Sequence, residues 1–290
     1  MIVRIISVLA IGAAAALPST PTQAQAQGPA PGVEHVEVFR ESGRYGGWPA
    51  NHGIWAWGDE ILVGFSAGHM NPALMQEGAP GRHPIDRTRP EQHLLARSLD
   101  GGGSWKIEHN TGLIPPPRPG QIAGVPTEPG GSEAKPYPGA ADFTARDFIL
   151  TLRMGDIHTG PSWFFTSTDR GRSWQGPFAF PDLGLRGIAA RTDYLVLGKQ
   201  EMLVFLTGAK SNAREGRPFV ARTADGGRTF QFLSWITPEP AEGFVIMPSS
   251  VRLDDGTIVT ATRRQVPAGR GGSTRGSRGA RCCRFPTSPY

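Results

Sequence analysis

Short runs of alternating apolar and polar residues, separated by Gly, Pro and Asp, recur along most of the chain. A period of two is typical of β-strands with one buried face, and no segment sustains the 3.6-residue period of a helix. The pattern therefore predicts an all-β protein without helices. The predicted strands cover residues 33–39, 54–57, 60–66, 93–98, 105–109, 147–154, 163–167, 193–198, 202–207, 220–223, 231–234, 245–251 and 258–262. The stretch 111–141, which carries eight prolines, is predicted to be a long loop.

Composition supports a globular body and locates the excess charge. The 290 residues include 39 Gly and 27 Pro, and 38% are hydrophobic, enough for one large core or two modest ones. A net charge of +5 would ordinarily suggest an anionic partner such as nucleic acid. Five of the arginines lie in residues 265–290, however, and without them basic and acidic residues balance at 25 each. We therefore expect no nucleic-acid partner.

The first 26 residues have the order of a secretory signal. Arg4 is followed by an apolar run of 13 residues, 5–17, which is too short to span a bilayer as a helix. The small residues Ala24 and Ala26 then predict a cleavage site. The sequence thus predicts a secreted or periplasmic protein whose mature chain has no membrane span. The alternative is a retained N-terminal anchor.

Three octamers share the pattern hydroxyl-x-Asp-x-Gly-x-hydroxyl-aromatic. They occupy 98–105, 167–174 and 223–230, and their aspartates are 69 and 56 residues apart. A tight hairpin needs a residue that accepts positive φ, which Gly supplies, and an Asp that bonds the amides of the turn. The aromatic residue is expected to fold under the turn into the core. The residues predicted to have this structural role are Ser98, Asp100, Gly102, Trp105, Ser167, Asp169, Gly171, Trp174, Thr223, Asp225, Gly227 and Phe230.

The octamers resemble the Asp-box, or bacterial neuraminidase (BNR) repeat, of the sialidase superfamily. That resemblance implies a β-propeller of four-stranded blades, with each box on an outer hairpin away from the active site. It also implies an exo-α-sialidase type of activity on sialic acid or a related acidic sugar. Propellers of this family have six blades, whereas residues 33–264 supply about four at the observed repeat spacing.

The resemblance further implies an acid/base Asp in a loop shortly before the first box, and Asp86 matches that spacing. A loop carboxylic acid near apolar walls can hold a raised pKa and protonate a departing glycosidic oxygen. The alternative is an ordinary loop Asp that the flanking Arg87 and Arg89 keep ionised.

Sialidases hold the substrate carboxylate with three arginines, because a planar guanidinium bonds a carboxylate through two parallel hydrogen bonds. Arg44 is nearest to the first of these, although the family's Arg-Ile-Pro triplet is not intact here. Arg263 matches the second, at the end of a strand that follows an Asp-Gly turn. Arg191 is a weaker candidate for the carboxylate clamp, and the alternative for it is a surface or packing arginine.

The nucleophile of the family is a Tyr activated by a Glu. Counting back from Gly256, the Glu position is occupied by Met247, and Glu242 would serve only in a different strand register. Tyr194 is a poor substitute, because a Tyr within a strand usually packs in the core. The family's third Arg and its Tyr belong to blades beyond the four counted here. A complete sialidase mechanism is therefore not expected, and the chain is predicted to be impaired or inactive.

Residues 265–290 differ from the rest of the chain, because they contain no acidic residue and no strand pattern. Cys282 and Cys283 also lie there, so the body is predicted to have no disulfide. One hypothesis is that this tail is an out-of-frame translation of a GC-rich gene whose intended product continues in another frame. The competing hypothesis is a natural basic tail that binds an anionic surface.

The leading prediction is an exported, monomeric, sialidase-like β-propeller of a glycoside hydrolase lineage, with a glycan or glycoconjugate as its partner. The seven His show no zinc spacing and there is no Gly-x-Ser-x-Gly elbow, so we expect no metal and no cofactor. The rival is a non-catalytic Asp-box propeller that binds glycans or protein partners. A third alternative is a glycosidase of the same fold with a different sugar and a rebuilt nucleophile.

Overall fold

The computed structural model describes residues 32, 34–74, 85–86, 88–109, 111–116 and 131–265, together with the backbone of 280–285. The chain divides into a short unit, Met1–His35, and a main unit, Val36–Tyr290, and the description below concerns the main unit. The predicted signal segment, residues 1–26, lies outside the described residues.

The main unit is all-β, as the sequence predicts, and its strands form four antiparallel sheets over the described residues. We number the sheets 1 to 4 in chain order. Sheet 1 contains β1 (Arg44–Gly47), β2 (Ile54–Trp57), β3 (Glu60–His69), β4 (Gln92–Ser98) and β5 (Lys106–His109). Sheet 2 contains β6 (Ile149–Met154), β7 (Ser162–Ser167) and β8 (Gln175–Phe180). Sheet 3 contains β9 (Ile188–Ala189), β10 (Tyr194–Val196), β11 (Met202–Ala209), β12 (Glu215–Thr223) and β13 (Gln231–Trp235), and sheet 4 contains β14 (Phe244–Arg252), β15 (Ile258–Gln265) and β16 (Ala280–Phe285).

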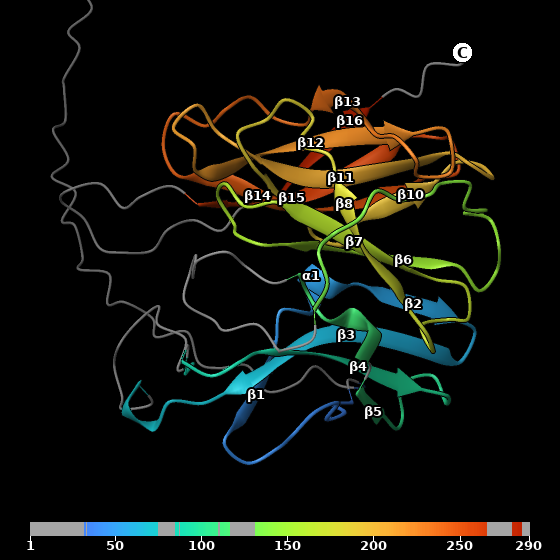
Figure 1. Ribbon diagram of the computed structural model, residues 1–290, viewed down its shortest axis with the longest axis vertical. Coiled ribbons are helices and arrows are strands. Elements are labelled where there is room, and N and C mark those ends of the chain that lie inside the picture. The colour runs from blue at the N-terminus through green and yellow to red at the C-terminus, as the bar shows by residue number, and fades with distance from the viewer. Residues whose placement is uncertain are drawn as a thin grey trace, which may run out of the picture. The chain divides into compact units, whose positions relative to one another are not determined.

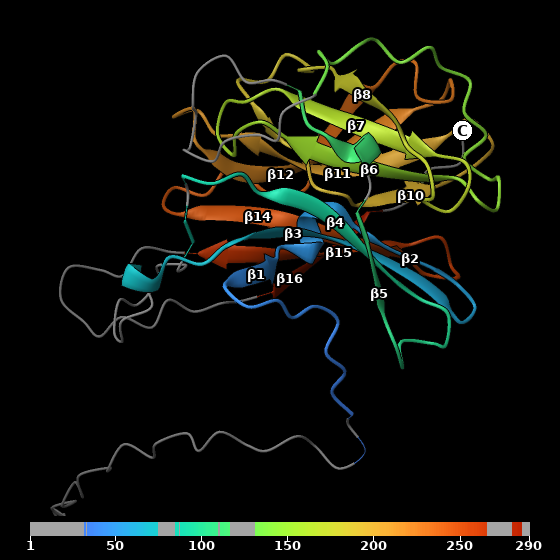
Figure 2. The same ribbon diagram turned by 60° about the horizontal axis from the view of Figure 1, so that its bottom comes forward.

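Each sheet packs face to face on the next one along the chain, so that successive sheets form successive layers (Figures 1 and 2). Leu95 of sheet 1 shares a buried cluster with Phe165 of sheet 2, and Phe205 of sheet 3 shares another with Ile258 of sheet 4. Because the middle sheets are covered on both faces, all six positions of β7 are buried and the strand shows no alternation. This stacking of consecutive antiparallel sheets is the way that β-propeller blades stack.

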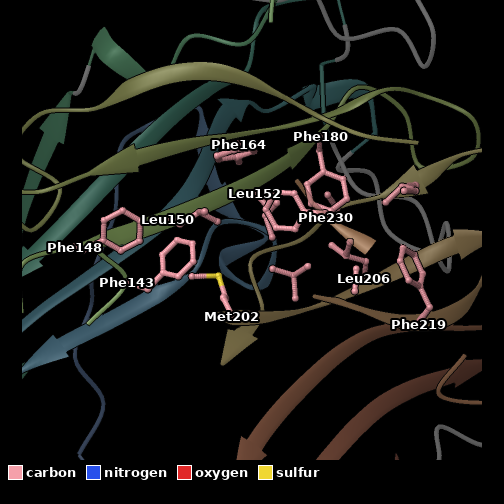
Figure 3. Packing of buried hydrophobic residues seen from close by; sticks show 14 residues of the cluster. Phe143, Phe148, Leu150, Leu152, Phe164, Phe180, Met202, Leu206, Phe219 and Phe230 are labelled. Carbon is pink, nitrogen blue, oxygen red and sulfur yellow. The ribbon is translucent and has the colours of Figure 1, made fainter. Parts of the chain in front are cut away.

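The largest buried cluster lies between sheets 2 and 3 (Figure 3). Leu152 and Phe164 of sheet 2 belong to it, together with Met202 and Phe219 of sheet 3. Burying a side chain of this size stabilises the fold by about 1.5–3 kcal/mol. The cluster therefore fixes the two sheets against each other and leaves their ends to carry polar groups.

Most predicted strands are present with ends shifted by a few residues, and the exceptions have local causes. The strand predicted at 33–39 is wrong, because residues 34–40 have no regular structure and Phe39 packs instead against a cluster on sheet 1. The sequence does not predict β1, β8 or β9, since each is very short or contains Gly or Pro. The expectation of no helix misses α1 (Pro49–His52), a single turn that begins at a Pro, which fits the first turn of a helix.

The two longest segments without a strand pattern have different outcomes. The prediction that residues 265–290 form no strand is wrong for Ala280–Phe285, which pairs with β15 as β16. A ladder of backbone hydrogen bonds needs no alternation of side chains, and an exposed strand edge offers the partners for one. Of the predicted loop at 111–141, residues 117–130 lie outside the described part of the chain, and Thr111–Leu113 forms a short 3-10 turn.

The sheets have two functionally different ends. The three octamers join β4 to β5, β7 to β8 and β12 to β13, and we call that end of the sheets the box end. At the opposite end, the loop end, β3 finishes at His69 and β6 finishes at Met154, while β12 begins at Glu215. Arg44, Asp86 and Arg191 all belong to the loop end.

Candidate functional site

Three matched hydrogen-bond networks occupy the box end. Ser98 Oγ donates to Asp100 Oδ1 at 2.8 Å, and Asp100 accepts the backbone N–H and the hydroxyl of Ser104 at 2.8 and 2.6 Å. The octamers at 167–174 and 223–230 contain the same bonds. The bonds from Ser104 and Ser98 lower the pKa of Asp100 to about 2. These carboxylates are therefore ionised and bonded within their own turns.

Arg191 lies at the loop end of sheet 3, just before β10, with its side chain buried. Its Nη1 bonds Glu215 Oε1 at 2.5 Å, and its Nε donates to Asn51 Oδ1 at 2.9 Å. Because Asn51 belongs to α1 and Glu215 begins β12, these contacts join sheets 1 and 3. The sequence predicts Arg191 as a candidate but misses Glu215 and Asn51, which stand in no recognisable motif.

Arg153, at the loop end of β6, is a second buried arginine that sequence reasoning missed. Only 5% of it is exposed. Its Nη1 donates to the backbone oxygens of Asn51 (3.2 Å) and Leu152 (2.9 Å) and to Thr151 Oγ1 (2.5 Å). No carboxylate of the described residues forms an ion pair with it. Burial lowers the pKa of Arg153 to about 9.

Two histidines, His52 of α1 and His93 of β4, stand beside Arg153. His93 Nδ1 accepts a hydrogen bond from Arg153 Nε at 3.4 Å, and the rings of His52 and His93 meet edge to face, 4.7 Å apart. His52 Nε2 bonds Ser66 Oγ at 2.8 Å, whereas its Nδ1 is buried without a partner. Burial, together with Arg153 and His93, holds the pKa of His52 well below its usual value. His52 is therefore neutral near pH 7 and adds no positive charge.

A pocket of about 750 Å³ opens next to Arg191. Its walls come from α1 and β2 in sheet 1, from the segment before and within β10 in sheet 3, and from β14 in sheet 4. The lining residues are Pro49, Ala50, Gly53, Ile54, Trp55, Val63, Arg191, Thr192, Asp193, Tyr194, Met247, Pro248, Ser249 and Ser250. Apolar walls with a few convergent polar groups are typical of small-ligand sites.

Asp193 is the one carboxyl group among the residues lining this pocket. Its two oxygens accept the backbone N–H of Ser250 at 3.2 Å and the Ser250 hydroxyl at 2.9 Å. Burial raises the pKa of Asp193 to about 7, although the bonds from Ser250 oppose that shift. A carboxyl group that titrates near neutral pH can act as a proton donor or acceptor. No sequence pattern singles out Asp193, because burial alone produces the shift.

Arg44 and Asp86 lie together at another corner of the loop end of sheet 1. Arg44 donates to Gly68 O at 3.0 Å and to Gln92 Oε1 at 2.7 Å, and Asp86 N bonds His69 O at 2.8 Å. Hydrogen bonds from the hydroxyl and backbone N–H of Thr88 lower the pKa of Asp86, which is therefore ionised near pH 7. Neither Arg44 nor Asp86 lines the pocket.

The other predicted residues lie in or near sheet 4 and are separated from one another. Arg263 is an exposed residue of β15 whose guanidinium lies 5.7 Å from the centroid of the Phe244 ring. Glu242 is exposed in the segment before β14. Met247 lines the pocket where the register of β14 shifts, and its φ is 56°. The structure thus gathers Arg191 and Met247 at the pocket and leaves Arg263 and Glu242 outside its lining.

The hydroxyl of Tyr194 is held within the structure. It accepts hydrogen bonds from Trp55 Nε1 at 2.9 Å and from Leu150 N at 3.4 Å. Burial raises the pKa of Tyr194. A phenol bonded in this way joins three sheet segments and is poorly placed to attack a ligand.

The described residues were also searched for metal ligands and membrane segments. They contain no group of three His, Cys, Asp or Glu side chains that could hold a metal ion. Within the same part of the chain, no helix is long and apolar enough to cross a bilayer.

Comparison with known proteins gives similarity in structure only. No family model and no curated protein matches the chain. A protein of unknown function from Dyadobacter fermentans is 17% identical, with a TM-score of 0.51, over 83% of this chain and 68% of that one. The likeness is one of fold. A GH93 α-L-arabinofuranosidase of Fusarium graminearum (14% identity, TM-score 0.46) covers 81% of this chain and 66% of its own. A Penicillium chrysogenum α-L-arabinanase is 15% identical, with a TM-score of 0.41, over 78% of this chain and 63% of that one. The chain thus spans about two thirds of the length of these structures.

Proposed function

We propose that this protein binds an acidic glycan at the loop end of its sheets and descends from exo-α-sialidase-type glycoside hydrolases. The observation that carries the proposal is the pair of buried arginines, Arg153 and Arg191, which come from different sheets and meet at Asn51 beside the pocket. Guanidinium groups held in place by other contacts suit the recognition of a planar carboxylate. The octamer resemblance supports a glycan as the ligand.

The pocket supports chemistry as well as binding. Asp193, with its pKa near 7, lines the same pocket as Arg191. In its protonated form it can donate a proton to a leaving oxygen, and in its ionised form it can accept one from water. We assign Asp193 the role of the general acid in this pocket, because Asp86 is held ionised by Thr88 and lies at a different corner.

The alternative, sialidase-type assignment instead uses Asp86 as acid/base, with Arg44 and Arg263 as carboxylate ligands. The shared corner of Arg44 and Asp86 around His69 supports that assignment. Glu242 would then be the activating carboxylate. Export to the periplasm or the medium, by removal of residues 1–26, belongs to the same proposal, since the glycans concerned are extracellular.

The experiment is binding and turnover with matched acidic and neutral sugars. Calorimetry with N-acetylneuraminic, galacturonic and glucuronic acids is compared with galactose, and 4-methylumbelliferyl glycosides of the acidic sugars report turnover. We expect binding of at least one acidic sugar, weakened at least tenfold in Arg191→Met. Arg222→Met removes an exposed arginine of the same sheet, paired with Glu201, and should bind normally. Equal binding of galactose and the acids, or no binding at all, would overturn the proposal.

A non-catalytic glycan-binding protein is the second candidate. Met247 stands where the resemblance expects the activating Glu, and the structure puts its thioether-bearing side chain at the pocket wall. Binding of an acidic sugar without release of 4-methylumbelliferone, unchanged by Asp86→Asn and by Asp193→Asn, would support this candidate over the enzyme.

A further inference from the structure

Arg153 is a buried cation whose charge no carboxylate of the described residues neutralises. Its hydrogen-bond acceptors among these residues are two backbone carbonyls, a threonine hydroxyl and an imidazole nitrogen. Burial is the cause of its lowered pKa. Taking a guanidinium out of water without a counterion is strongly unfavourable, so proteins rarely retain one.

Two buried carboxylates of the loop end, Glu215 and Asp156, are already engaged. Glu215 bonds Arg191. Asp156, two residues beyond the end of β6, accepts the backbone N–H groups of His158 and Thr159 at 2.7 and 2.9 Å. Neither carboxylate forms an ion pair with Arg153 within the described residues. The loop end thus contains a cation for which the described part of the chain supplies no carboxylate partner.

The two histidines beside Arg153, His52 and His93, do not supply a negatively charged partner either. His93 Nδ1 accepts from Arg153 Nε, so it supplies this guanidinium with an acceptor but with no negative charge. His52, whose ring contacts His93, leaves its Nδ1 buried without a partner. One buried cation and one unsatisfied ring nitrogen therefore lie in the same layer between sheets 1 and 2.

The guanidinium itself is held ready for a ligand. Nη1 and Nε make every hydrogen bond of the side chain with the described residues, and they fix its plane from α1, β6 and β4. Nη2 has no partner among those residues. A planar group fixed on one side and open at its second terminal nitrogen is the arrangement that recognises an oxyanion.

We propose that Arg153 is the recognition residue of a subsite for a compact oxyanion, such as a carboxylate, sulfate or phosphate group, between the loop ends of sheets 1 and 2. His93 is its positioning residue. The subsite deepens the function proposed above, because the anion would be the charged substituent of the bound glycan.

The test titrates the full chain with sulfate, phosphate and glucuronate, each against sodium chloride at equal ionic strength, and follows the melting temperature and the heat of binding. We expect at least one oxyanion to raise the melting temperature more than chloride does. In Arg153→Met, the oxyanion concentration needed for the same rise in melting temperature should increase at least tenfold. In Arg153→Lys, which keeps the charge without the planar guanidinium, it should increase less. Comparing glucuronate with the two tetrahedral ions identifies the kind of group.

The control variant is Arg97→Lys, which alters an equally buried arginine of the facing sheet and should leave the response intact. If Arg153→Met does not fold, Arg153→Gln replaces it, since the amide retains hydrogen bonds to the carbonyls. An oxyanion response that is equal in wild type and Arg153→Met overturns the inference, as does a wild type that responds only to ionic strength. An Arg153-dependent sulfate response without any sugar binding would retain the inference and overturn the proposed function.

Discussion

Arg97 and Arg153 are buried to the same degree at opposite ends of one interface, that between sheets 1 and 2, with 6% and 5% of their surfaces exposed. At the box end, Arg97 bonds Glu60 and Glu108, each at 2.7 Å. At the loop end, Arg153 meets only neutral acceptors among the described residues. The two arginines are equally buried, but carboxylates neutralise only the charge of Arg97 among the described residues. Arg97 therefore stabilises the packing of the sheets, whereas Arg153 is available to a ligand.

At the box end, the ion pairs of Arg97 belong to a larger network. Besides Arg97, Glu60 pairs with Arg170 at 2.6 Å and with Arg172 at 3.0 Å, both from the second octamer. Arg170 also bonds Asp147 and stacks 5.4 Å from the centroid of Trp57. Although burial raises the pKa of Glu60, the hydrogen bonds from Arg170 and Arg97 outweigh it and lower that pKa. Such a network links neighbouring sheets and leaves no charge for a ligand.

The largest effect is expected from Arg97→Met. The variant leaves Glu60 and Glu108 facing an apolar side chain, and breaking a buried ion pair from one side costs about 3–5 kcal/mol. Urea denaturation followed by tryptophan fluorescence measures the loss. A loss below about 1 kcal/mol would show that the box-end network contributes little, and the contrast with Arg153 would then fail.

The next effect concerns the buried carboxyl of the loop end, Asp193. Its folded pKa, about 7, lies above the ordinary Asp value of 3.8, so the folded state binds the proton more tightly. Stability therefore falls as pH rises from about 4 to 7, and the loss approaches about 1.4 kcal/mol per unit of pKa difference. Asp193→Asn should match wild type near pH 4 and exceed it at pH 8. Parallel stability curves for the two proteins across this range would contradict the burial argument.

A smaller effect is expected within an octamer. Ser167 Oγ accepts the N–H of buried Gly171 at 2.8 Å and donates to Asp169 at 2.7 Å. Ser167→Ala removes the hydroxyl from both of these hydrogen bonds, and removing one partner of a buried hydrogen bond costs about 1–3 kcal/mol. Ser132→Ala, outside the octamers, is the control, and thermal denaturation is the measurement. Ligand binding at the loop end should be unchanged, because the two ends share no hydrogen bond through this turn.

Sequence reasoning worked best where one short segment contains all the interacting groups. Asp100, Ser98 and Ser104 bond one another within a single octamer, so their spacing alone predicts the contacts. The strand pattern likewise predicts β2 at residues 54–57 and most of β11. Edge strands such as β1 and β16 escape prediction, since backbone pairing with a neighbour, rather than alternation, creates them.

The loop-end groups could not be predicted in the same way. Arg153 and Asn51 are about a hundred residues apart, and what distinguishes Arg153 is that no described residue offers it a carboxylate, which no local pattern encodes. The pKa of Asp193 differs from that of an ordinary Asp at a strand end because of burial. The residues that bury it belong to sheets formed by earlier and later parts of the chain. Arg191 was found as a candidate through its residue type, while its partner Glu215 needed the fold.

The smallest effect is expected from Arg153→Met, and its sign decides the comparison. Replacing a buried charge by an apolar side chain of similar length removes the cost of burying that charge, while the carbonyls and Thr151 lose their donor. These terms oppose each other, so we expect the free energy of unfolding, without added oxyanion, to change by no more than about 1 kcal/mol. The same Arg-to-Met change at Arg97 should cost several times as much. Urea denaturation of both variants in one low-salt buffer makes the comparison. A loss at Arg153 as large as that at Arg97 would mean that the fold, and not a ligand, depends on its charge.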